Sequence, residues 1–220
     1  MHHFDDIFDI AAHRHVGIDA LNGKLSPPKS MQDLAAMPED RWLSIITKCV
    51  FQAGFAWKVI DAKWDGFETA FDGFDVGRCA FMDDEKFDSL LQDTRIVRNG
   101  TKIATVRENA AFLMELRAEG GAGQVLGCWP STDFIGLLSM LSKRGARLGG
   151  ASAQYAMRFA GRDSFILSRD VTARLIAEGV IDKPATSKKA MTAVQGAFNT
   201  WMDQSGRSLT EISRVLAMSV

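Results

Sequence analysis

Two short segments of this sequence combine residue types that could hold a nucleic acid. The first, residues 51–57, reads Phe-Gln-Ala-Gly-Phe-Ala-Trp and places an amide and a glycine among large rings. The second, residues 93–103, carries an arginine and a lysine around an Asn-Gly pair. Aromatic rings stack on bases, whereas basic side chains bind phosphates. Together the segments indicate a protein that holds a nucleic-acid backbone on a turn and presents an aromatic pocket to one base.

Each of these side chains also has an interpretation that involves no ligand. Trp57 and Phe55 are of types that most often fill a core. Gln52 could satisfy its amide within the fold, as a buried amide must. Arg98 and Lys102 could be ordinary solvated charges. The sequence therefore predicts a binding role only through the combination of the two segments.

The composition is that of an ordinary globular chain. Its 220 residues are 46% hydrophobic and 24% charged, with a formal net charge of −1. The length suits one or two packed domains, and the balanced charge lends no support to nucleic-acid binding by the whole surface. Cys49, Cys79 and Cys128 are too few and too scattered for a disulfide framework or a CxxC metal site, so we expect a reduced, cytoplasmic setting. We also expect no secretory signal and no membrane helix.

Hydrophobic periodicity predicts helices throughout, so the expected fold class is all-α, with roughly eight to ten helices. Leu43, Ile46, Val50 and Trp57 share one helical spacing, with Pro38 early in that helix. The other predicted helices span residues 84–92, 101–119, 134–144, 151–160, 168–178 and 187–204, and a last one opens at Ser208. In the helix over residues 101–119, the predicted buried stripe is Ile103, Val106, Ala110 and Leu113. Asp133 and Ser168 are predicted N-caps, Gly120 a C-terminal cap, and Ser208 with Glu211 a capping box.

Three motifs resemble, in order and spacing, those of the DNA-3-methyladenine glycosylase I family. They are residues 52–57, 93–103 and 141–150, and the similarity covers about residues 42–175. This family belongs to the helix-hairpin-helix DNA glycosylase superfamily, so the resemblance implies that helical fold. It also implies a single glycosylase-like unit over residues 1–220, to which residues 187–220 add a C-terminal helical extension.

The resemblance implies excision of alkylated purines of the 3-methyladenine type in base-excision repair. The partner is then double-stranded DNA containing alkylated bases, and neither a cofactor nor a membrane is expected. The target base must leave the stack because its reactive atoms are inaccessible within it. A methylated purine is cationic and already a good leaving group, so aromatic rings and positioning matter more than acid catalysis.

Carried over residue by residue, the resemblance assigns two groups of side chains. The base pocket consists of Cys49, Gln52, Phe55 and Trp57. The DNA-binding hairpin consists of Arg98, Asn99, Gly100, Thr101 and Lys102. We expect Gly100 to adopt a positive φ, and the helix that begins near Thr101 to offer free N–H groups to a phosphate. A helix end near Gly54 would help the pocket residues to converge.

The sequence differs from the family at the positions that recognise the base and bind zinc, and it lacks a carboxylate at the position of the superfamily's catalytic aspartate. Cys49 occupies the position of the base-recognising glutamate. Of the family's zinc ligands only His13 has a match, because Asp170 and Arg174 stand at the C-terminal ligand positions, so we expect no metal. Ser168 stands where other superfamily members place a catalytic aspartate, which leaves Asp170 as the nearby carboxylate. Two alternatives therefore stay open: a catalytically silent protein that binds damaged DNA, and a helical interaction module.

Overall fold

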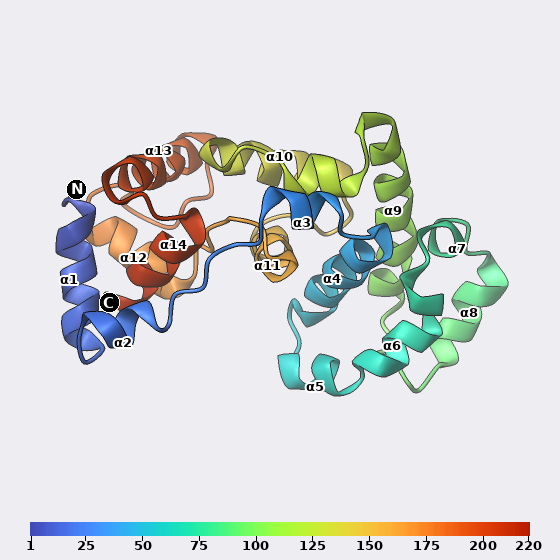
Figure 1. The fold of residues 1–220 in the computed structure, drawn as a ribbon. Coiled ribbons are helices and arrows are strands. Elements are labelled where there is room, and N and C mark those ends of the chain that lie inside the picture. The colour runs from blue at the N-terminus through green and yellow to red at the C-terminus, as the bar shows by residue number, and fades with distance from the viewer. The chain divides into compact units, whose positions relative to one another are not determined.

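The computed structural model describes residues 1–220 as helices joined by turns and loops, without a strand (Figure 1). The predicted all-α fold class is confirmed. The chain forms 14 α-helices, more than the predicted eight to ten. The additional ones are short, such as α2 (Ile18–Asn22) and α3 (Met31–Ala35), and too few turns repeat in them to give a periodic pattern. None of the helices combines the length and the apolar character needed to cross a membrane.

The chain divides into two compact units. The first comprises Met1–Lys29, Pro130–Gly136 and Gly161–Val220, and the second comprises Ser30–Trp129 and Leu137–Ala160. The first unit contains α1 (Phe4–Arg14), α2, α12 (Arg169–Ala177), α13 (Lys188–Ser205) and α14 (Leu209–Met218). The second contains α3, α4 (Glu39–Gln52), α5 (Trp57–Ala62), α6 (Trp64–Ala70), α7 (Val76–Ala80), α8 (Asp84–Gln92), α9 (Gly100–Leu116) and α11 (Ala151–Ala160). Helix α10 (Phe134–Arg144) begins in the first unit and continues in the second.

The second unit is built around α9, which packs against α4 and α7. The predicted stripe on this helix is confirmed, because Ile103, Val106, Ala110 and Leu113 are each at most 1% exposed. Helix α4 also packs against α11, which lies about 100 residues later in the chain. Burial of these faces removes apolar surface from water and fixes α4, α9 and α11 as one scaffold.

Helices α8 and α9 form a helix-loop-helix hairpin, with residues 93–99 as the loop. The bounds of α8 are those predicted. Asn99 caps α9, because its side-chain oxygen accepts a hydrogen bond from the Lys102 backbone N–H at 3.1 Å. The expected positive φ at Gly100 is wrong, since this residue is the first of the helix and is not among the left-handed glycines. A Cβ atom there would lie 3.2 Å from Leu91 Cδ2, so close packing of α8 on α9 explains the glycine.

Helix ends elsewhere follow the predicted caps. Gly120 has φ 104° after the 3-10 turn that continues α9. Ser168 accepts a hydrogen bond from the backbone of Val171 at 3.2 Å, and Ser208 forms the predicted capping box with Glu211. Pro38 is not inside a helix but is the N-cap of α4. Local side-chain chemistry therefore defined most helix boundaries.

Residues 187–220 form α13 and α14, which lie within the first unit. Helix α14 packs against α1, α12 and α13. Phe198 and Trp201 of α13 are fully buried, and Phe198 stacks on Phe165 with ring centroids 4.5 Å apart. These C-terminal helices therefore supply much of the first unit's core.

Candidate functional site

A break after α4 shapes the candidate site in the second unit. Helix α4 ends at Gln52, Gly54 adopts φ 75°, and a new helix, α5, begins at Trp57. Glycine adopts this left-handed backbone conformation at little cost, whereas residues with a Cβ atom do so at a higher cost. The sequence spacing that placed Trp57 on the same helix as Leu43 is therefore misleading. The predicted helix end near Gly54 is confirmed.

This break brings all four predicted pocket residues to one cavity of about 240 Å³. The cavity is lined by Cys49, Gln52, Phe55, Trp57, Ser152 and Tyr155, among others. Ser152 and Tyr155 lie on α11, so the cavity closes between α4, the loop that follows it and α11. Tyr155 is the one tyrosine of the chain, and nothing in the motif pattern singled it out.

The aromatic side chains of this cavity are not core residues. Trp57 is 41% exposed and Phe55 is 40% exposed. The Trp57 ring meets Tyr155 edge to face, with centroids 5.0 Å apart at 87°. Large exposed rings beside a cavity are unusual for a side chain whose task is packing alone. The geometry thus favours a binding surface over the core interpretation of Trp57.

Cys49 gives the cavity a neutral floor. Its side chain is buried at 3% exposure, and this burial raises the pKa of the thiol to about 12. The thiol therefore stays protonated near neutral pH and supplies neither a negative charge nor a general base. No carboxylate lines this cavity.

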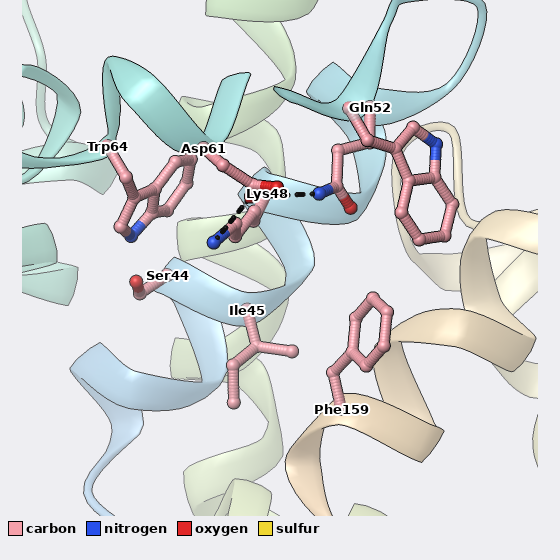
Figure 2. A pocket seen from close by; sticks show the side chains of 8 residues that line it. Ser44, Ile45, Lys48, Gln52, Asp61, Trp64 and Phe159 are labelled. Atoms are coloured by element: carbon pink, nitrogen blue, oxygen red, sulfur yellow. Dashed lines mark hydrogen bonds and ion pairs between the residues drawn. The ribbon is translucent and has the colours of Figure 1, made fainter. Parts of the chain in front are cut away.

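Gln52 stands between this cavity and a second one of about 400 Å³, which is drawn in Figure 2. Its Nε2 atom donates a hydrogen bond to Asp61 Oδ1 at 3.3 Å. The same carboxylate oxygen pairs with Lys48 Nζ at 2.9 Å. The Gln52 Oε1 atom is buried and has no partner. Trp57 also lines both cavities.

Lys102 has a different environment from the one that the hairpin motif predicted. Its side chain is only 5% exposed, and Nζ donates hydrogen bonds to the carbonyl oxygens of Phe51, at 3.0 Å, and Ala53, at 2.5 Å. The ammonium group also lies 4.5 Å from the centroid of the Phe55 ring. Burial and the charge of Arg147 lower the pKa of Lys102. The prediction that Lys102 contacts phosphate is therefore corrected: its charge satisfies the C-terminal carbonyl groups of α4.

Arg98 has the exposed side chain that the predicted contact with a phosphate requires. Its side chain is exposed and makes no hydrogen bond or ion pair. Its neighbour Arg95 differs, because its guanidinium pairs with Asp93 at 2.7 Å. The Thr101 hydroxyl donates to the Asn99 side chain at 2.8 Å, which rigidifies the cap at the start of α9.

Arg147 is a second exposed cation of this region and was not among the predicted site residues. It lies in a turn with φ 55°, within the third motif. The buried side chain of Asn109 holds this turn, donating to the Ala146 carbonyl at 3.1 Å and accepting from the Ala146 N–H at 2.8 Å. The only sequence signal for Arg147 was its place in a motif that carried no assigned role.

Part of the site, namely the segment with Cys49 to Trp57 and the hairpin, lies in a region that is similar to known proteins. A model of the methyladenine glycosylase family matches residues 37–128. Over this segment the chain is similar to the methyladenine glycosylase family. DNA-3-methyladenine glycosylase 1 of Escherichia coli (strain K12) is 30% identical over 84 residues, which are 38% of this chain and 41% of that protein. The match therefore spans about two fifths of the length of this curated relative.

Solved structures of 3-methyladenine DNA glycosylase I share the fold. A variant from Staphylococcus aureus has a TM-score of 0.50 at 17% identity, covering 67% of this chain and 88% of that one. A variant in complex with 3-methyladenine has a TM-score of 0.50 at 18% identity, with the same two coverages. The resemblance predicted from the three motifs is confirmed, together with the helical glycosylase fold.

The other residues that the resemblance singled out, His13, Asp170 and Arg174, lie in the first unit. Asp170 is exposed in the first turn of α12, after the Ser168 cap. Arg174 binds the Ser219 hydroxyl at 2.7 Å and Glu178 at 3.4 Å, which gives it a structural role. His13 is exposed at the end of α1. No three His, Cys, Asp or Glu side chains gather as a metal site would require.

Proposed function

We propose that this protein is a DNA N-glycosylase that excises alkylated purines of the 3-methyladenine type. The observation that carries the proposal is the cavity that joins Cys49, Gln52, Phe55 and Trp57 in the unit that also holds the hairpin. A flipped base would enter this cavity beside the Trp57 and Tyr155 rings, which attract a cationic purine. Arg98 and the N-terminus of α9 would hold the DNA backbone.

Catalysis in this proposal rests on positioning. The thiol of Cys49 is neutral, so no group lining the cavity can act as an anion beside the base. An alkylated purine leaves without protonation, and the rings need only hold the nucleotide where water can attack the sugar. Asp170 stays a candidate for supporting a positively charged sugar.

The second candidate function is a catalytically silent protein that binds damaged DNA. One observation favours it, namely that the cavity contains no carboxylate. Such a protein would keep the base pocket and the hairpin but would release no free base.

The test is incubation with duplex DNA that carries methylated purines, followed by chromatography for free base. The proposal expects release by the native protein and loss of release by Trp57→Ala, whereas nonspecific DNA affinity stays nearly unchanged because backbone contacts remain. Phe81→Ala, which removes a ring that is 78% exposed and lines neither cavity, is the matched control. Lesion-selective binding without release would favour the silent protein, and no preference for the lesion would contradict both functions.

A further inference from the structure

The larger cavity in Figure 2 has the size and the lining of a small-molecule site. It holds about 400 Å³ between α4, α5, α6 and α11. Ligand sites are commonly cavities of roughly 300–1,000 Å³ with apolar walls and few polar groups. The apolar walls here are Ile45, Trp57, Trp64 and Phe159. The main polar groups are Lys48, Gln52 and Asp61.

The Gln52 amide oxygen supplies an unused hydrogen-bond acceptor in this cavity. The residue is 4% exposed, and its Oε1 atom has no partner. Figure 2 shows the amide nitrogen on the Asp61 side and the oxygen turned toward the space above Phe159. A buried acceptor without a partner destabilises the fold, so the position favours a ligand that donates a hydrogen bond.

The orientation of this amide is fixed by its neighbours. Asp61 can only accept hydrogen bonds when ionised, so the nitrogen of Gln52 must face it and the oxygen must face the cavity. Lys48 Nζ, 2.9 Å from the same carboxylate oxygen, holds Asp61 in place. Lys48 and Asp61 therefore act as positioning residues for an acceptor that cannot turn into a donor.

The rings beside this acceptor suit a planar ligand. Phe159 is 46% exposed and Trp57 is 41% exposed, and their rings meet at 81° with centroids 5.9 Å apart. Two large rings exposed side by side are uncommon on a surface that binds nothing. The charges of Lys48 and Asp61 cancel, so the cavity favours neither a cation nor an anion.

We propose that this cavity is a second binding site, distinct from the one lined by Cys49, for a neutral aromatic base that donates an N–H to Gln52 Oε1. An exocyclic amino group, as in adenine, meets this requirement. The base could be free or part of a single strand, and the chemistry of recognition is the same in both cases. The proposal does not require that the protein cleave DNA.

The experiment titrates the full chain with free adenine and, separately, with single-stranded oligo(dA), using calorimetry. The ligand control is 9-methylpurine, called purine below, which has neither the amino group nor the ring N–H of adenine and therefore cannot donate to Gln52 Oε1. We expect saturable binding of adenine, oligo(dA) or both, with purine weaker by about tenfold. Binding of adenine alone would identify a free base as the occupant, and competition by oligo(dA) would identify a strand.

Variants separate this cavity from its neighbour. Ile45→Trp fills the larger cavity and should abolish binding, whereas Ser152→Trp narrows only the smaller one and should retain it. Phe159→Ala should weaken binding about tenfold through lost stacking, and Phe81→Ala should not. Asp61→Asn frees the Gln52 amide to turn and should bring adenine and purine to similar affinity. Circular dichroism and thermal melting show whether each variant folds.

Three results would overturn the proposal. The first is the absence of saturable binding by both adenine and oligo(dA). The second is equal affinity of the native protein for adenine and purine. The third is binding that survives in a folded Ile45→Trp variant and is unaffected by Phe159→Ala. If Ile45→Trp does not fold, the Phe159→Ala and Asp61→Asn results decide.

Discussion

The Nζ atom of Lys102 lies 2.5 Å from the carbonyl oxygen of Ala53. This contact joins the first turn of α9, the helix that follows the hairpin, to the loop between α4 and α5 that carries Phe55. Because the same ammonium also binds the Phe51 carbonyl, one side chain satisfies two acceptors that α4 leaves unpaired at its end. The hairpin and the candidate base pocket are therefore mechanically connected.

Lys102→Met should destabilise the fold. The methionine keeps the length of the side chain but leaves the buried carbonyl group of Phe51 and the partly buried one of Ala53 without this donor. We expect the free energy of unfolding, measured by urea denaturation, to fall by about 2–3 kcal/mol. This figure allows for the desolvation cost of the buried ammonium group, which the variant no longer pays. Lys143→Met, which replaces an exposed lysine without a partner on α10, should change it by less than about 0.5 kcal/mol. Equal effects of the two variants would show that the contact with α4 contributes nothing.

Arg98→Glu should weaken DNA binding regardless of sequence. Arg98 is exposed and unpaired, so it can release a counterion when it meets a phosphate. A plot of log affinity against log salt concentration should become less steep by about one unit. Fluorescence anisotropy at several salt concentrations measures this slope. Lys102 is excluded from this prediction because its charge is already engaged.

The control for this variant is Arg117→Glu, which makes the same change of charge just past the opposite end of α9, at an arginine that pairs with Glu39 at 2.7 Å. The helix has 17 residues, which places Arg117 about 25 Å from the hairpin. This control should leave the salt slope nearly unchanged. If Arg98→Glu also leaves it unchanged, the hairpin is not in the DNA interface.

Much of the fold could be predicted from the sequence because helix ends are set by local chemistry. Residues 84–92, 134–144 and 151–160 form helices with the predicted bounds. Each stretch combines a continuous apolar face with a capping or glycine signal at one end. The short helices were missed because five or six residues cannot display a repeat.

The site was predictable only where its residues are close in the sequence. Gln52 and Trp57 fall in one motif. The helix break that brings them to the same cavity is at Gly54, and glycine is a residue type that indicates such a break. Lys102 was misinterpreted because the carbonyl groups that it binds are 51 and 49 residues away. Tyr155 was missed for the same reason, since only the packing of α11 on α4 brings it to the cavity.

The buried thiols should make stability fall in alkaline solution. Burial raises the pKa of Cys49 and of Cys79 from 9.0 to about 12. Below pH 9 both thiols are protonated in the folded and unfolded states, so their contribution is fully present. Between pH 9 and 12 only the unfolded state ionises, and each thiol should cost about 1.4 kcal/mol of stability per pH unit.

Cys49→Ala tests this dependence. Between pH 10 and 11 the variant should lose about 1.4 kcal/mol less stability than the native protein, as measured by urea denaturation at each pH. Cys79→Ala should behave similarly, and the double variant should show the sum of the two effects. An unchanged pH dependence in Cys49→Ala would mean that this thiol ionises as readily in the folded state, which its position at the floor of the pocket does not allow.

Cys49→Glu should increase the release of cationic bases if the proposed glycosylase activity is present. A carboxylate at this position would lie in the same cavity as Gln52 and Trp57 and attract a positively charged methylpurine. We expect at least tenfold more free 3-methyladenine from methylated duplex DNA than with Cys49→Gln, which matches the glutamate in size but carries no charge. The buried carboxylate should also lower the melting temperature relative to Cys49→Gln, since burial penalises the charged form. If neither the native protein nor Cys49→Glu releases base while both still bind the lesion, the pocket recognises damage without cleaving it.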